Sequence, residues 1–79
     1  MVRIFNIVQN DDKISCNYEP EKSGKYGYIE IDTKSMEINK ITYSEYEYGK
    51  KMYVAQVRNK LNEALQKNEL SSELYAVWF

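Results

Sequence analysis

Only one segment of the chain has the spacing of an amphipathic helix, and this limits the folds that the chain can adopt. From about residue 50 to residue 67, apolar side chains recur at steps of three and four residues, which places them on one stripe. The stripe consists of Tyr53, Val57, Leu61, Ala64 and Leu65. A helix with one apolar stripe can cover one face of a sheet and no more. We therefore expect a sheet with one covered face and one open face.

The remaining segments supply the strands of that sheet. β-Branched and aromatic residues, or alternation of apolar with polar residues, mark five segments: residues 1–8, 14–19, 26–32, 36–41 and 74–79. The polar connection at 33–35 joins two of them as a hairpin. The fold class predicted is therefore α+β. It is an antiparallel sheet of four to five strands with one helix packed on one face, in the order β-β-β-β-α-β, and a single domain over residues 1–79.

The helix carries local signals at both of its ends. Ser44, followed three residues later by Glu47, fits a capping box, in which each side chain bonds the backbone N–H of the other residue. Gly49 is unfavourable inside a helix, so the regular helix is expected to start at or after it. Asn68 is the expected C-terminal stop of the helix.

Some apolar residues cannot reach the core that the helix covers. The first strand has them at both parities, with Val2, Ile4 and Val8 opposed to Phe5 and Ile7. In the fourth strand, Ile41 and Tyr43 have the parity opposite to that of Met36 and Ile38. Because side chains alternate between the two faces of a strand, one set in each case is expected on the open face.

Composition indicates a folded protein without disulfides. Apolar residues make up 43% of the chain and the net charge is −1, so the signature of disorder is missing. Cys16 is the one cysteine, which excludes an internal disulfide. The N-terminal residues do not resemble a signal peptide, and no apolar run approaches the length of a membrane span. We therefore expect a cytoplasmic protein that does not enter a membrane.

The residue inventory argues against an enzyme. The chain has no histidine, the usual general base near neutral pH, and Cys16 lies on the predicted core face, where a thiolate is disfavoured. Zinc requires more cysteine or histidine ligands than one. Asp11 with Asp12 could hold a hard cation, and Glu30 with Asp32 could act as an acid–base pair or hold magnesium. A turn and a solvated strand face explain these two pairs as well. We therefore predict no catalytic residues, no metal site and no cofactor.

Tyrosine is the unusual feature of the composition, with eight residues in 79. A tyrosine presents a rigid apolar ring with a polar tip, which favours it at protein interfaces. The candidate interface residues are Tyr26, Tyr28, Tyr43, Tyr46 and Tyr48. We therefore predict a non-catalytic protein-interaction module that binds a protein partner or a second copy of itself, through the face opposite the helix or through an edge strand.

Two other functions are compatible with the sequence. Residues 50–68 hold five cations against Glu63 alone, so a basic helix together with exposed tyrosines could bind nucleic acid. The candidate contacts are Lys50, Lys51, Arg58, Lys60 and Lys67. Alternatively, the acidic and aromatic segment 43–48 suits a small inhibitor or immunity-type protein that blocks an enzyme.

Overall fold

The computed structural model describes residues 1–47 and 52–77, and every structural statement below concerns those residues. The elements, in chain order, are β1 (Val2–Asn10), β2 (Lys13–Pro20), β3 (Gly27–Asp32), β4 (Ile38–Thr42), a 3₁₀ turn (Glu45–Glu47), α1 (Met52–Gln66) and β5 (Glu73–Ala76). The predicted order of four strands, a helix and a fifth strand is confirmed. The five strands form one antiparallel sheet in the spatial order β4-β3-β2-β1-β5.

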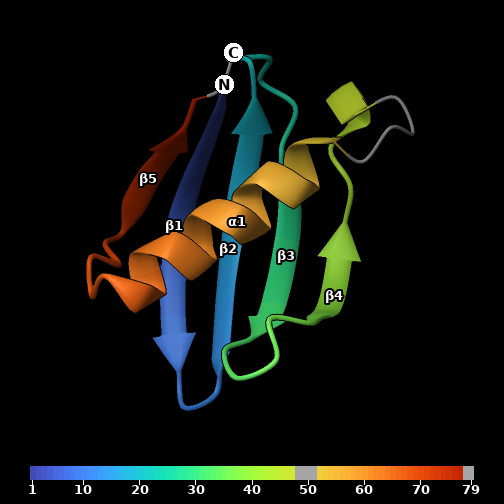
Figure 1. The fold of residues 1–79 in the computed structure, drawn as a ribbon. Helices are drawn as coiled ribbons and strands as arrows, with labels where there is room; N and C mark the ends of the chain where they lie inside the picture. Colours follow the sequence, from blue (N-terminus) through green and yellow to red (C-terminus); the bar gives the residue numbers. More distant parts are fainter. Residues whose placement is uncertain (48–51, 78–79) are drawn as a thin grey trace.

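The helix explains why the last strand lies at the far edge of the sheet. Strands β1 to β4 form a meander, in which each strand pairs with the one before it. α1 then crosses the sheet diagonally from the β3 and β4 side to the β5 side, and the chain returns as β5 beside β1 (Figure 1). No helix among the described residues is long and apolar enough to cross a membrane.

The core lies between α1 and one face of the sheet. The strands contribute Val2, Ile4, Ile14, Cys16, Tyr18, Ile29, Ile31 and Ala76, and the helix contributes Tyr53, Val54, Val57 and Leu61. Ile14, Ile29, Ile31, Val57 and Leu61 are completely buried. The helical stripe and the alternating strand positions therefore meet as the sequence predicts, and the opposite face of the sheet is not covered by α1 (Figure 1).

A β-bulge in β1 changes which of its apolar residues face the core. Phe5 pairs with Asn17 but Val8 pairs with Ser15, so one extra residue of β1 lies between these two pairs. Asn6 has a positive φ of 53°, a conformation that asparagine tolerates better than most residues. Beyond the bulge the parity is reversed, which places Ile7 against the core and Val8 on the open face. The predicted grouping of Val8 with Val2 and Ile4, and of Ile7 with Phe5, was therefore wrong.

A second bulge corrects the prediction for β4. Ile29 pairs with Ile41 and Ile31 pairs with Ile38, although Ile38 and Ile41 have opposite parity, because Asn39 is inserted between them. Ile41 accordingly packs against the core rather than on the open face. β4 begins at Ile38 and not at residue 36, because Met36 occupies the preceding turn with a positive φ of 59°.

The N-terminal end of α1 is capped by a residue that precedes the helix in the chain. Oε1 of the buried Glu47 accepts hydrogen bonds from the backbone N–H groups of Tyr53 (3.0 Å) and Val54 (3.4 Å). The carboxylate thereby satisfies N–H groups that have no partner within the helix. The predicted capping box was wrong: the N–H of Ser44 donates to the Tyr18 hydroxyl (3.0 Å), and the Ser44 hydroxyl accepts from Tyr46.

The C-terminal end of α1 stops where the sequence predicts. Asn68 is left-handed, with φ of 55°, and its N–H donates to the carbonyl of Leu65. The N–H of Glu69 donates to the carbonyl of Ala64 at 2.8 Å. This pair of bonds is a Schellman motif, which satisfies the last helical carbonyls and turns the chain toward β5.

Candidate protein interface

The open face of the sheet has an aromatic centre. Phe5 on β1 and Tyr26, just before β3, meet edge to face with ring centroids 5.6 Å apart and an interplanar angle of 74°. The Arg3 guanidinium lies 4.3 Å from the Phe5 ring centroid. Tyr28 is on the same face, because it alternates with the buried Ile29 and pairs with Asn17, the partner of Phe5. We name these four residues, Arg3, Phe5, Tyr26 and Tyr28, the aromatic cluster.

The cluster is open to solvent to different degrees. Tyr26 is 57% exposed, whereas Phe5 and Tyr28 are partly buried. Val8 and Tyr75, each 48% exposed, lie on the same face. A molecule that covered these side chains would remove their exposed apolar area from water, and this burial favours binding.

Charged side chains, including Arg3 of the cluster, surround the aromatic rings, and most of them pair with one another. The strand registers place three cations on this face, Arg3, Lys13 and Lys40, and four anions, Glu19, Glu30, Asp32 and Glu73. Arg3 contacts Glu73 at 3.2 Å and Glu19 at 3.6 Å, and Lys13 lies 4.0 Å from Glu30. The face is therefore close to neutral, with aromatic rings beside the Asn17 amide at its centre and charged side chains around them. A polar rim around aromatic residues is also the usual anatomy of a protein interface.

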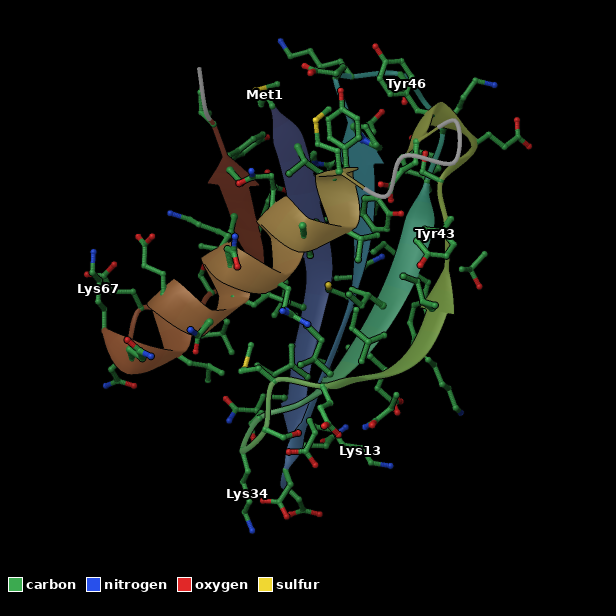
Figure 2. The ribbon with its side chains drawn as sticks, turned by 45° about the vertical axis from the view of Figure 1, so that its right-hand side comes forward. Met1, Lys13, Lys34, Tyr43, Tyr46 and Lys67 are labelled. Carbon is green, nitrogen blue, oxygen red and sulfur yellow. The ribbon has the colours of Figure 1, made fainter. Side chains whose placement is uncertain are left out.

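The predicted interface tyrosines do not all lie on this surface. Tyr26 and Tyr28 belong to the aromatic cluster. Tyr43 follows β4 and is 42% exposed, and Tyr46 lies near the N-terminal end of α1, where it packs edge to face on Tyr53 at 5.7 Å (Figure 2). Tyr48 is outside the described residues. Tyr46 therefore borders the core side of the sheet, away from the aromatic cluster.

Two residues at the centre of the open face were not among the sequence-based candidates. Arg3 and Phe5 lie in the first strand, and the bulge at Asn6 separates the face of Phe5 from that of Ile7. The signal in the sequence was the change of apolar parity between Ile4 and Ile7 with an asparagine inside it.

A shallow hollow lies beside the aromatic cluster. It has a volume of about 410 Å³ and is lined by Gly24, Lys25, Tyr26, Thr42, Tyr43 and Glu45. Lys25 and Glu45 form an ion pair at 3.3 Å across it. The hollow thus extends the open surface from Tyr26 toward the end of β4.

The basic residues of the helix are partly neutralised. Glu63 lies between Lys60 (3.6 Å) and Lys67 (3.5 Å), and these two ammonium groups hold the pKa of its carboxyl below the usual range. Arg58 is exposed, and Lys67 lies at the far end of α1 (Figure 2). Lys50 and Lys51 are outside the described residues.

Much of the acidic and aromatic segment 43–48 is engaged in the fold. Glu47 caps α1 and also accepts a hydrogen bond from the buried Tyr18 hydroxyl. Burial raises the pKa of Tyr18, and the bond to Glu47 acts in the same direction. Ser44 is also buried, and its hydroxyl donates to the carbonyl of Lys25 at 2.7 Å. Glu45, with its side chain 84% exposed, is the acidic residue that this segment offers to solvent within residues 43–47.

Cys16, Asp32 and Asp12, considered from the sequence for catalysis or metal binding, are each engaged in contacts within the fold. Burial raises the pKa of the Cys16 thiol to about 12, which disfavours a thiolate. Asp32 accepts hydrogen bonds from the N–H groups of Lys34 (2.8 Å) and Ser35 (3.1 Å), and these bonds lower the pKa of its carboxyl. Asp12 lies 3.5 Å from Lys34.

Comparisons with known proteins add no family to this description. No protein-family model matches the chain, and neither a curated protein nor a solved structure matches it significantly.

Proposed function

We propose that the chain is a non-catalytic interaction module whose open sheet face docks the surface of another protein. The observation that supports this proposal best is the aromatic cluster, in which Phe5 and Tyr26 meet edge to face on the side of the sheet that α1 does not cover. Aromatic residues and arginine are enriched at the centres of protein interfaces. Aromatic rings bury large areas with little loss of side-chain entropy, and the planar guanidinium of arginine stacks on rings and donates several hydrogen bonds.

Charge favours a protein over a nucleic acid as the partner of this face. A nucleic-acid surface needs an excess of Lys and Arg to displace counterions from phosphates, whereas this face carries four carboxylates against three cations. The basic side of α1 offers Arg58 as an exposed cation, but Glu63 neutralises part of the charge of Lys60 and Lys67. We therefore retain nucleic-acid binding as the second candidate, with binding to labelled oligonucleotides at low salt as its test.

The partner can be sought by affinity capture from the native cell with variants of the full chain. Tyr26→Ser removes an exposed ring from the aromatic cluster, and Met52→Gln changes a residue of similar exposure on the helix side of the molecule. We expect one protein to be retained by the wild type and by Met52→Gln and lost with Tyr26→Ser. Captured proteins that are retained equally by all three chains would contradict docking at this face.

The version in which the open face binds a second copy has its own test. Light scattering after size-exclusion chromatography gives the mass in solution, and Tyr26→Ser should convert a face-to-face dimer to a monomer. A monomer at high concentration would exclude this version. If the chain instead inhibits an enzyme through the acidic segment 43–48, Glu45→Ala should abolish capture of that enzyme, whereas Tyr26→Ser should not.

A further inference from the structure

The two edges of the sheet differ in how they are protected against pairing with another strand. β4 forms one edge, and it carries the bulge at Asn39 and the exposed Lys40, two features that discourage strand addition. β5 forms the other edge (Figure 1). Within Glu73–Ala76 there is no proline, no lysine and no bulge, and the register with β1 is continuous.

The side chains of the β5 edge suit an apolar contact. Tyr75 is 48% exposed and Val77, which follows the strand, is 62% exposed. Glu73 is the charged residue of β5, and it is already engaged by Arg3 at 3.2 Å and by the Tyr75 hydroxyl at 2.9 Å. Because Arg3 compensates the charge of Glu73, two identical β5 edges repel each other less than the uncompensated carboxylates would.

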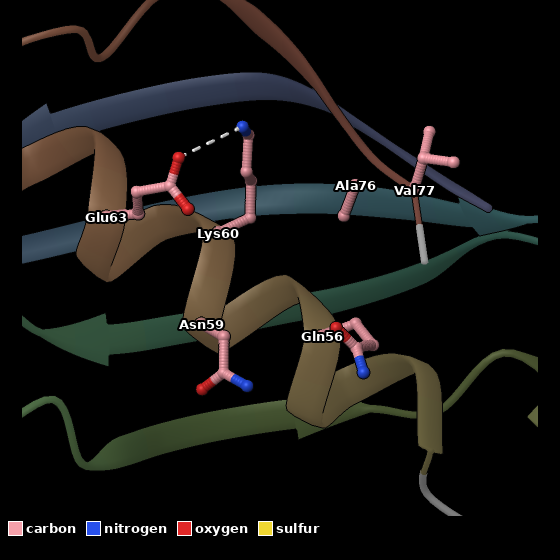
Figure 3. Close-up of a pocket in the computed structure, with 6 residues that line it drawn as sticks. All are labelled: Gln56, Asn59, Lys60, Glu63, Ala76 and Val77. Atoms are coloured by element: carbon pink, nitrogen blue, oxygen red, sulfur yellow. Dashed lines mark ion pairs between the residues drawn. The ribbon is translucent and has the colours of Figure 1, made fainter. Parts of the chain in front are cut away.

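A pocket lies beside the C-terminal end of this edge, on the helix side of the sheet. It has a volume of about 140 Å³, with Gln56, Asn59, Lys60 and Glu63 of α1 on one side and Ala76 and Val77 on the other (Figure 3). Lys60 and Glu63 form an ion pair in its wall. A strand added to β5 would pass this pocket near Ala76, where the polar side chains of α1 can accept or donate hydrogen bonds.

We propose that β5 is a self-association edge, through which two copies of the chain pair antiparallel and form one continuous ten-stranded sheet. A second copy is the favoured occupant because the edge is near neutral and can oppose itself in registers that keep Glu73 away from its symmetry mate. Registers with Tyr75 opposite Tyr75 or Glu73 of the second copy meet this condition, whereas like charges directly opposite are destabilising.

This arrangement has a consequence for the open face. Identical antiparallel strands in one sheet are related by a two-fold axis perpendicular to that sheet. Both helices therefore lie on one side of the dimer, and both aromatic clusters lie on the other. The paired module would present two copies of the proposed docking surface to the same partner. The edge contact itself does not depend on the proposed function.

The four residues of β5 make a small contact, so the dimer should be weak. Stable interfaces bury about 1,200–2,000 Å² in total, and a short strand edge with its neighbouring pocket falls below that range. We therefore expect the mass in solution to rise with concentration, and not a dimer at all concentrations.

Mass measurements on two matched variants test the proposal. Tyr75→Glu places a carboxylate opposite either the same substituted residue or Glu73 of the second copy, so like charges oppose each other in both registers. Val8→Glu makes the same kind of change at a residue of equal exposure, 48%, away from the edge. Light scattering is carried out over about a hundredfold range of concentration, and circular dichroism checks that each variant is folded. We expect the wild type and Val8→Glu to dimerise at high concentration and Tyr75→Glu to remain monomeric.

The alternative outcomes overturn the proposal. A wild type that is monomeric over the whole range excludes the edge dimer. A dimer that survives Tyr75→Glu but is lost with Tyr26→Ser forms through the open face instead. As a second readout, amide exchange of residues 73–76 should slow with increasing concentration in the wild type, and unchanged exchange there would also contradict the proposal. Failure of the capture experiment with Tyr26→Ser would leave these results unaffected.

Discussion

Tyr18 shows how one side chain joins three parts of the molecule. It is fully buried, its hydroxyl donates to Glu47 and accepts the N–H of Ser44, and its ring occupies the space where a side chain on Gly27 would be. Glycine is therefore required at position 27 because a Cβ would not fit there, and not because the backbone adopts a special conformation. The strand pair β2 and β3 and the start of α1 are fixed together by this contact.

A methyl group at position 27 tests that packing. Gly27→Ala would place its Cβ against the Tyr18 ring and 2.8 Å from the carbonyl oxygen of Thr42, so we expect a loss of about 1–3 kcal/mol in the free energy of unfolding. Denaturant titration measures it. Combined with Tyr18→Leu, which shortens the side chain, the cost should be less than the sum of the two single costs. Additive costs would show that an alanine at position 27 does not clash with the Tyr18 ring.

Leu61 tests the helical stripe. Leu61 is completely buried, so Leu61→Ala should leave a cavity and cost about 2–4 kcal/mol in the free energy of unfolding. Leu70→Ala removes a partly buried leucine at the edge of the core and should cost less. Equal costs in denaturant titrations would contradict the placement of Leu61 at the centre of the core.

At the scale of elements, the sequence predicted the type and order of the strands and the helix, because apolar periodicity is set by which residues must be buried. It did not predict the faces of Ile7, Val8 and Ile41. A bulge inserts one unpaired residue into a strand, so the residues beyond it face the opposite side from the one that simple alternation predicts. Asn6 and Asn39, each located at a change of apolar parity, were the visible signals.

The candidate site was predictable to a similar extent. Strand alternation in residues 26–32 predicts that Tyr26 and Tyr28 share one face, opposite Ile29 and Ile31. The register confirms this for Tyr28, and Tyr26, which precedes the paired residues, meets Phe5 on the same face. Arg3 and Phe5 precede the bulge and alternate with the buried Val2 and Ile4, so alternation alone places them on the open face once Val2 and Ile4 are assigned to the core. The role of Glu47 could not be predicted from local spacing, because it caps a helix whose first residue lies five positions further on and also bonds a tyrosine from β2.

The cap of α1 gives a prediction at this scale. Glu47→Ala removes the acceptor for two helical N–H groups and for the buried Tyr18 hydroxyl, so it should cost about 2–4 kcal/mol in the free energy of unfolding. Glu45→Ala, in the same turn but exposed, should change it by less than about 0.5 kcal/mol. Similar values for the two variants would mean that the cap contributes little.

For the whole molecule, alkaline pH should weaken the fold. Burial, aided by the hydrogen bond to Glu21, raises the pKa of Tyr53 from 10.0 to about 12. Below pH 10 the phenol is protonated in both the folded and the unfolded chain, so its contribution to stability is fully present. Above pH 10 the unfolded chain loses the proton first, and this contribution is lost as the pH rises toward 12. Tyr18 and Cys16, whose pKa values burial also raises, act with the same sign.

Melting temperatures measured by circular dichroism across this pH range check the effect. The wild type should lose melting temperature steadily, and Tyr53→Phe, which has no phenol to ionise at that position, should lose it less steeply. Because the variant also lacks the bond to Glu21, its melting temperature should already be lower at neutral pH. Parallel slopes for the two proteins would show that Tyr53 does not contribute to the pH dependence.

Considered as one object, the molecule has a side that its own helix covers and a side that carries an aromatic centre with a balanced polar rim. Site-specific photo-crosslinking in the native cell tests directly whether that second side binds a protein. A photoreactive phenylalanine analogue is placed at Tyr26 on the open face or at the exposed Ala55 on α1. We predict a defined protein adduct from position 26 and none from position 55. Adducts from position 55 alone, or from neither position, would contradict docking at the open face.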